Sequence, residues 1–160
     1  MEIQKSMEEV LELQKNHFLK EGPPSYDLRI DRLNRVQDVV IQNKKRITEA
    51  LNTDFGSRSP NQSLISDVYG VLPAFSHAKK YLKSWMKDEK RKSNFPFGLM
   101  GAKSFIHREP LGVVGMISPW NFPMYLSLAP LAGIFSAGNQ VMHKPSEFTP
   151  CTSKLLKEIC

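Results

Sequence analysis

Residues 113–117 form an unbroken apolar segment, Val-Val-Gly-Met-Ile, which is typical of a strand buried on both faces of a parallel sheet. A helical pattern follows over residues 124–136, and a Gly-Asn pair at 138–139 ends it. A second apolar strand is predicted over residues 140–143, so the order is a βαβ unit. Because two strands cannot bury both faces of the helices packed on them, we expect the sheet to be incomplete.

The segment before this unit is predicted to be helical. Apolar residues recur at mostly helical spacing over residues 2–18, 28–51 and 61–87, and Gly-Pro-Pro at 22–24 ends the first run. Residues 52–59 are predicted to be the turn that closes the second. We therefore expect an α/β fold in which N-terminal helices precede the start of a Rossmann-like parallel sheet.

A change of composition over residues 94–101 indicates a boundary, since proline and glycine stand there among large apolar residues. We interpret this segment as a hinge-like loop. A short strand over residues 104–107 and a turn over 109–112 are expected next. Residues 149–160 are predicted to form a final helix, because Thr-Pro at its start suits a helix N-terminus.

The net charge of +6 raises the question of a nucleic-acid partner. Many of the basic residues lie within residues 79–92, opposite apolar positions of a predicted helix. We interpret them as a solvated helix face followed by a basic loop, and expect no nucleic acid as a partner.

The cysteines and the apolar segments bear on the compartment. Cys151 and Cys160 are the only cysteines and form no CxxC pair, which disfavours a disulfide scaffold or structural zinc. The first residues lack the pattern of a secretory signal. The longest apolar stretch, residues 122–137, is interrupted and too short to span a bilayer. We expect a cytoplasmic protein.

The loop after the first strand is a candidate for catalysis, because α/β proteins bind ligands at the carboxyl ends of strands. Pro119 and Pro123 bracket Trp120, Asn121 and Phe122, which would fix the direction of the Asn121 amide. A fixed amide N–H suits the stabilisation of an oxyanion. The alternative is structural, with Asn121 capping the next helix and Trp120 filling the core.

The loop after the second strand places Lys144 and Glu147 side by side. Both could meet a nucleotide ribose, and a carboxylate there favours NAD over NADP. The alternative is a solvated ion pair. The chain has no GxGxxG motif, and Cys151 has no patterned base beside it, so we do not expect Cys151 to be a nucleophile. The four histidines have no metal-ligand spacing.

Four segments occur in order over about fifty residues: Glu-Pro-Leu-Gly-Val-Val at 109–114, Ser-Pro-Trp-Asn-Phe-Pro at 118–123, Ser-Ala-Gly-Asn at 136–139 and Lys-Pro-Ser-Glu-Phe-Thr-Pro at 144–150. Together they resemble the N-terminal portion of the aldehyde dehydrogenase superfamily. The approach at residues 102–104 and the ending at 148–150 resemble the branch that includes fatty-aldehyde, aromatic-aldehyde and bacterial coniferyl aldehyde dehydrogenases.

The resemblance implies oxidation of an aldehyde to the carboxylic acid through a cysteine thiohemiacetal, with hydride passing to NAD, or to NADP as the alternative. Asn121 matches the asparagine whose amide holds the oxyanion. Lys144 and Glu147 match the pair that binds the adenosine ribose. The wall of the cofactor pocket is matched by Ile117, Ser118, Pro119 and Trp120.

The resemblance also implies a domain plan and a subunit partner. Residues 1–101 are the expected N-terminal helical region, residues 102–111 a ribbon strand of the oligomerisation element, and residues 112–160 the first part of the NAD-binding βαβ domain. The ribbon suggests a homodimer for the intact enzyme.

The family's nucleophilic cysteine, glutamate base and later glycine-containing cofactor loop have no counterpart in these residues. We therefore expect the chain alone to be inactive and the intact protein to act on an aldehyde, either an aromatic one such as coniferaldehyde or a long-chain aliphatic one. The alternative function is that of a truncated, non-catalytic protein that binds nucleotide or pairs with another subunit.

Overall fold

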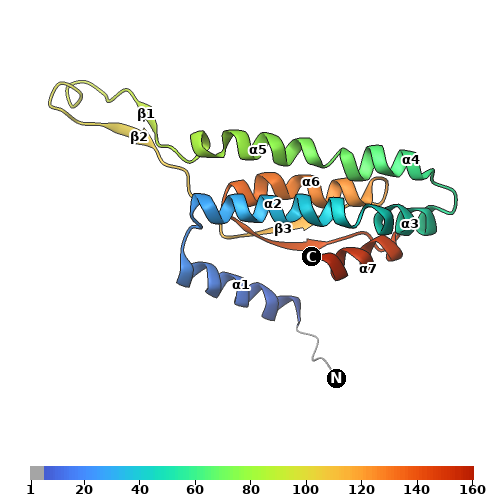
Figure 1. Ribbon diagram of the computed structural model, residues 1–160. Coiled ribbons are helices and arrows are strands. Elements are labelled where there is room, and N and C mark those ends of the chain that lie inside the picture. Colours follow the sequence, from blue (N-terminus) through green and yellow to red (C-terminus); the bar gives the residue numbers. More distant parts are fainter. Residues whose placement is uncertain (1–5) are drawn as a thin grey trace.

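The computed structural model describes residues 6–160, so the start of the helix predicted over residues 2–18 lies outside the described residues. The expected α/β organisation is confirmed, with helices before a parallel pair of strands (Figure 1). The helical elements are α1 (Met7–Glu21), α2 (Tyr26–Gln42), α3 (Lys44–Phe55), α4 (Pro60–Ser63), the π-helix η1 (Leu64–Tyr69), α5 (Leu72–Trp85), α6 (Pro123–Ser136) and α7 (Pro150–Ile159). The strands are β1 (Glu89–Arg91), β2 (Ser104–Ile106), β3 (Val113–Ile117) and β4 (Gln140–Lys144).

The predicted βαβ unit is present. Strands β3 and β4 are parallel, with Val113 opposite Gln140 and Ile117 opposite Lys144, and α6 connects them. Helix α1 contacts both strands, and so does α6, so the strands lie between these two helices (Figure 1). The carboxyl ends of β3 and β4 therefore open at the same edge of the sheet.

The helical half packs directly on α6 and does not form a separate body. Helices α2 and α5 both contact α6 as well as one another, and α3 packs against α7. The contacts are made by apolar side chains that are fully or almost fully buried, including Leu33, Val40, Phe75, Leu82, Met124 and Leu128. One continuous core thus joins the helices to the βαβ unit.

Helix α6 contains no charged residue of its own, and the carboxyl end of this helix is served by Arg29 of α2. The buried Arg29 guanidinium donates from Nη1 to the Ser136 carbonyl at 2.8 Å and from Nε to the Pro24 carbonyl at 3.0 Å. A cation at this end satisfies a free carbonyl and opposes the helix dipole.

Gly138 closely follows α6, with a φ of +87°, and a Cβ at this position would lie 2.8 Å from Arg29 Cζ. We expect Gly138→Ala to lower the free energy of unfolding by about 1–3 kcal/mol, because the side chain strains the backbone and displaces a pinned guanidinium. Urea unfolding measures the change. Gly133→Ala is the matched control, since nothing lies within 4 Å there, and it should be neutral or stabilising. Equal effects from both substitutions would contradict the prediction.

The structure corrects the predicted helix boundaries. The run over residues 28–51 is divided at Asn43, whose side-chain amide donates to the Val39 carbonyl at 2.9 Å and ends α2. The turn predicted over residues 52–59 begins only after Phe55, because α3 continues to that residue. The apolar spacing continues past Asn43 and Phe55, so it did not indicate where the helices end.

The predicted basic loop after α5 contains a strand. Strand β1 pairs antiparallel with β2, with Glu89 opposite Ile106 and Arg91 opposite Ser104. Residues 94–101 therefore form the tip of a hairpin and not a hinge between regions, and the ribbon includes residues assigned from sequence to the helical region. A three-residue charged strand has no apolar pattern of its own and is defined by its partner. The division into domains otherwise stays a prediction.

None of the helices formed by residues 6–160 has the length and hydrophobicity needed to cross a bilayer.

Candidate functional site

The two predicted loops lie together at the carboxyl edge of the sheet. The Ser118 N–H donates to the Lys144 carbonyl at 3.1 Å, and the Ser118 hydroxyl lies 2.8 Å from His143 Nε2. Further out, the rings of Trp120 and Phe148 meet edge to face with centroids 5.3 Å apart. The structure thus brings together the residues after β3 and those after β4.

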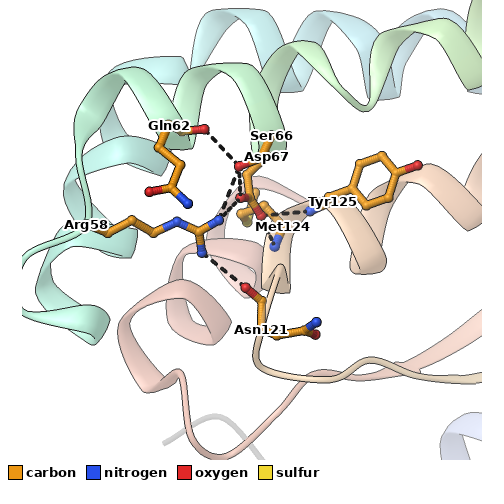
Figure 2. Close-up of polar contacts among 7 residues, drawn as sticks. All are labelled: Arg58, Gln62, Ser66, Asp67, Asn121, Met124 and Tyr125. Atoms are coloured by element: carbon orange, nitrogen blue, oxygen red, sulfur yellow. Dashed lines mark hydrogen bonds and ion pairs between the residues drawn. The ribbon is translucent and has the colours of Figure 1, made fainter.

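Asn121 is exposed on the first loop, and its side chain does not cap α6. The N-cap residue is Phe122, which makes no side-chain cap bond. Within residues 6–160, no hydrogen bond joins the Asn121 side-chain amide to another group, and Figure 2 shows this amide turned away from the Arg58 guanidinium. The amide N–H groups of Asn121 are therefore available to a ligand, which agrees with the oxyanion interpretation and disfavours the capping one.

Asp67, in η1, takes the capping role that Asn121 does not. Asp67 Oδ1 accepts the N–H groups of Met124 and Tyr125 at 3.2 and 3.1 Å, in the first turn of α6 (Figure 2). The carboxylate is 0% exposed, and its other oxygen pairs with Arg58 Nη2 at 2.7 Å. Burial is tolerated because every one of these partners is a donor.

Arg58 connects this carboxylate to the Asn121 loop. Its Nη1 donates to the Asn121 backbone carbonyl at 3.2 Å (Figure 2). The guanidinium also lies over the rings of Phe55 and Phe122, at 4.9 and 5.1 Å from their centroids. Neither Arg58 nor Asp67 was predicted from the sequence as a site residue. The available signal was a carboxylate within the apolar stripe of a predicted helix, beside Val68.

Asp54, near the end of α3, caps the start of α7 as Asp67 caps the start of α6. Its carboxylate accepts the backbone N–H of Cys151 at 2.9 Å and that of Thr152 at 2.7 Å. In an ordinary dinucleotide-binding fold, such helix N-termini carry the phosphates. Protein carboxylates already occupy these donors at α6 and α7, which agrees with the absence of a GxGxxG motif.

Lys144 and Glu147 form the predicted neighbouring pair, with Lys144 Nζ 2.6 Å from Glu147 Oε2. Both side chains are exposed, and the hydrogen bond from Lys144 lowers the pKa of Glu147. This geometry agrees with a solvated ion pair and leaves both groups accessible to a ribose.

The four residues expected to line the cofactor pocket differ in exposure. Ile117 is 81% exposed and Trp120 55%, so both present an apolar surface at the sheet edge. Pro119 is also exposed, whereas Ser118 is buried and its hydroxyl contacts His143. Three of the four therefore face solvent beside the exposed Lys144 and Glu147.

Cys151 lies in the first turn of α7 but is not activated there. Partial burial is the main cause that raises the pKa of its thiol, and the nearby Asp54 carboxylate raises that pKa further. A raised pKa keeps the sulfur protonated near neutral pH, and a thiol is a poor nucleophile. Across residues 6–160, no three His, Cys, Asp or Glu side chains cluster as metal ligands would.

We expect His143 to make the stability of the chain depend on pH. Burial lowers the pKa of His143, so the folded state resists its protonation. Its contribution is fully present above the unfolded pKa of about 6.5 and is lost as pH falls through the lowered folded value. We expect His143→Gln to reduce the loss of stability between about pH 7.5 and about pH 5, measured by urea unfolding.

His107 provides a control of opposite sign. The hydrogen bond that His107 Nδ1 donates to the Asp88 carboxylate is the main cause that raises the pKa of His107. The contribution of His107 to stability is therefore present below about pH 6.5 and is lost as pH rises through the raised value. Accordingly, His107→Gln should steepen the loss of stability on acidification. An unchanged pH profile in His143→Gln would contradict the assignment.

The chain matches a known protein family and several known proteins. The sequence model described as "Aldehyde dehydrogenase family" matches residues 15–160. A probable coniferyl aldehyde dehydrogenase of Caulobacter vibrioides is 51% identical over 152 residues, covering 94% of this chain and 31% of that protein. A coniferyl aldehyde dehydrogenase of a Pseudomonas species is 44% identical over 149 residues, covering 93% and 30%.

Solved structures agree with these sequence relatives. The substrate-bound AldH of Staphylococcus aureus superposes with a TM-score of 0.89 at 28% identity, covering 98% of this chain and 34% of that one. The chain therefore spans about a third of the length of the proteins it matches.

Proposed function

Since the chain belongs to the aldehyde dehydrogenase family, we propose that it forms the amino-terminal part of an enzyme that oxidises an aldehyde to the carboxylic acid. The observation that carries the proposal is the exposed Asn121 amide, held on a proline-bracketed loop at the carboxyl edge of the sheet. The intact protein, meaning the full gene product that contains these 160 residues, is the proposed enzyme.

In the proposed reaction, a cysteine outside these residues attacks the aldehyde carbon, and the carbonyl oxygen becomes an oxyanion. The Asn121 amide N–H donates a hydrogen bond to this oxygen and stabilises the charge as it develops. Arg58 holds the backbone from which this amide projects before the substrate arrives, so little reorganisation of the loop is needed at the moment of reaction. We do not propose Cys151 as the nucleophile, because the raised pKa of its thiol disfavours the thiolate.

The described residues fit a nicotinamide dinucleotide, which would accept the hydride. Ile117, Pro119 and Trp120 provide an exposed apolar wall, and Lys144 and Glu147 are accessible beside it. We propose that the Glu147 carboxylate and the Lys144 ammonium hydrogen-bond the adenosine ribose. The capped starts of α6 and α7 leave the cofactor phosphates to be held by other parts of the intact protein.

Glu147 should favour NAD over NADP, because its carboxylate accepts from a ribose diol and repels a 2′-phosphate. We expect the intact protein to bind NAD more tightly, and Glu147→Gln to narrow the difference by about tenfold, since removing a like charge beside a phosphate is worth about 1.4 kcal/mol. Isothermal titration with both cofactors measures this. Equal affinity in the unmutated protein would remove the basis for the preference.

We propose an aromatic aldehyde such as coniferaldehyde as the substrate, because the relatives at 51% and 44% identity are described as coniferyl aldehyde dehydrogenases. The test compares kcat/KM of the intact protein for coniferaldehyde and for a long-chain aliphatic aldehyde, following NADH formation. A higher value for the aliphatic aldehyde would favour the other substrate class. Failure to oxidise any aldehyde would favour the non-catalytic alternative, a nucleotide-binding or subunit-pairing protein.

The hairpin of β1 and β2 supports a further proposal, that the intact protein is a homodimer. The tip of this hairpin exposes an apolar surface that a soluble monomer would leave in water. The exposed side chains are Phe95, Phe97, Leu99 and Met100, each at least 61% accessible. Sedimentation of the intact protein tests the proposal, and a monomer at micromolar concentration would overturn it.

A further inference from the structure

The Asn121 loop is fastened to the helical half of the chain through one buried ion pair. Arg58 precedes α4, and Asp67 lies in η1, more than fifty residues before the loop that they contact. Their side chains are 7% and 0% exposed. Because both side chains are buried, we infer that neither touches a ligand itself.

We propose that Arg58 and Asp67 are positioning residues that fix the orientation of Asn121 in the proposed reaction. This inference rests on the role of Asn121 as oxyanion donor proposed above. Arg58 Nη1 holds the Asn121 carbonyl, and so fixes one of the two peptide planes that flank its side chain. Figure 2 shows the side chain projecting away from this contact.

The same unit also fixes the far end of the loop. Asp67 Oδ1 binds the N–H groups of Met124 and Tyr125, while Asp67 Oδ2 binds Arg58. The backbone from Asn121 to Tyr125 is therefore tied at both ends to one carboxylate–guanidinium pair. Phe122, inside that segment, packs its ring against the guanidinium at 5.1 Å. The loop cannot shift without breaking several of these contacts together.

Holding the loop in place should affect the reaction rate, because catalysis requires accurate positions of the reacting groups. Catalytic groups have to be held to within about 0.5 Å of the productive geometry by supporting contacts. A misplacement of about 1 Å can cost about 10²-fold in rate. Ser66 further limits movement of Arg58, since its Oγ accepts from Arg58 Nη2 at 3.1 Å.

The first test measures loop order by hydrogen exchange of the backbone amides of residues 120–125 in the full 160-residue chain. The double variant Arg58→Met/Asp67→Asn removes both charges and the bond to Asn121, while the new amide oxygen can still accept from α6, so we expect the chain to fold. We expect exchange in this loop to rise by about tenfold, as local opening becomes easier. Unchanged exchange would overturn the proposal, whatever the kinetics show.

Arg46→Gln is the matched control. It removes another arginine–carboxylate pair between helices, with Arg46 Nη2 2.5 Å from Glu158 Oε2, but the pair is half-exposed and joins α3 to α7. Exchange in residues 120–125 should not change in this variant. A rise equal to that of the double variant would mean that general destabilisation loosens the loop, and would also overturn the proposal.

The second test is a kinetic cycle in the intact protein. We expect Arg58→Met/Asp67→Asn to lower kcat by about 10- to 100-fold and to leave the Kd for NAD within about twofold. In an Asn121→Ala background the same pair of changes should alter kcat by less than about threefold, because the group being positioned is absent. Fully additive losses would show a general structural role. If Asn121→Ala alone leaves kcat unchanged, the proposed function fails, while the exchange result still decides whether the pair holds the loop.

Discussion

Replacing Asn121 with alanine is expected to lower kcat for aldehyde oxidation by the intact protein by about 10²- to 10³-fold, the usual loss when one oxyanion donor is removed. The structure gives the reason, since the side-chain amide is exposed while the backbone is held by Arg58. The donor is therefore lost without loss of the loop. Steady-state kinetics with saturating aldehyde and NAD measure the effect.

Two further measurements make this result specific. The Kd for NAD should stay within about twofold, because the donor acts on the developing charge and not on the bound ground state. Asn52→Ala is the control, since this exposed asparagine lies in α3 and is not among the proposed site residues, so its substitution should leave kcat unchanged. A fall in kcat of less than about threefold in Asn121→Ala would contradict the oxyanion role.

Removing Arg58 alone should lower the free energy of unfolding more than any other substitution proposed above. We expect Arg58→Met to lower the free energy of unfolding of the chain by about 3–5 kcal/mol, because it leaves the Asp67 carboxylate buried without its cation. The penalty comes from the stranded charge more than from the lost attraction. Urea unfolding measures it, with the m-value showing whether the transition stays two-state.

The companion variants separate this cause from ordinary loss of packing. Arg58→Met/Asp67→Asn should recover most of the loss, since no buried charge remains. Arg46→Gln should cost no more than about 1 kcal/mol, because its ion pair with Glu158 is half-exposed. If Arg58→Met and the double variant proved equally unstable, the stranded charge would not be the cause.

The parts of the fold that the sequence predicted are those with strong local patterns. The apolar segment of β3 and the order strand, helix, strand were sufficient to predict the βαβ unit. The bracketing prolines indicated a loop between the first strand and the next helix, and this loop is present between β3 and α6. Adjacency of the two loops followed from the parallel arrangement, since the carboxyl ends of such strands share an edge.

The parts that the sequence did not predict depend on contacts between distant residues. Asp54 was assigned to a turn, yet it ends α3 and binds the start of α7 almost a hundred residues later. Asp67 and Arg58 were not distinguished from other polar residues, because their importance comes from the loop that folds onto them. Strand β1 was missed because only its pairing with β2 identifies it. The roles proposed for the seven site residues stay predictions.

Because helix α6 contains no charged residue, its dependence on distant residues limits how related genes can recombine. Asp67 accepts two N–H groups of its first turn and Arg29 donates to its last carbonyl, that of Ser136, and both residues lie before residue 101. A recombination event between the hairpin and β3 would therefore join a helix from one parent to end groups from another. Such hybrids should fold only when both parents have an acid at position 67 and an arginine at position 29. We therefore expect the segments before and after this junction to be inherited together.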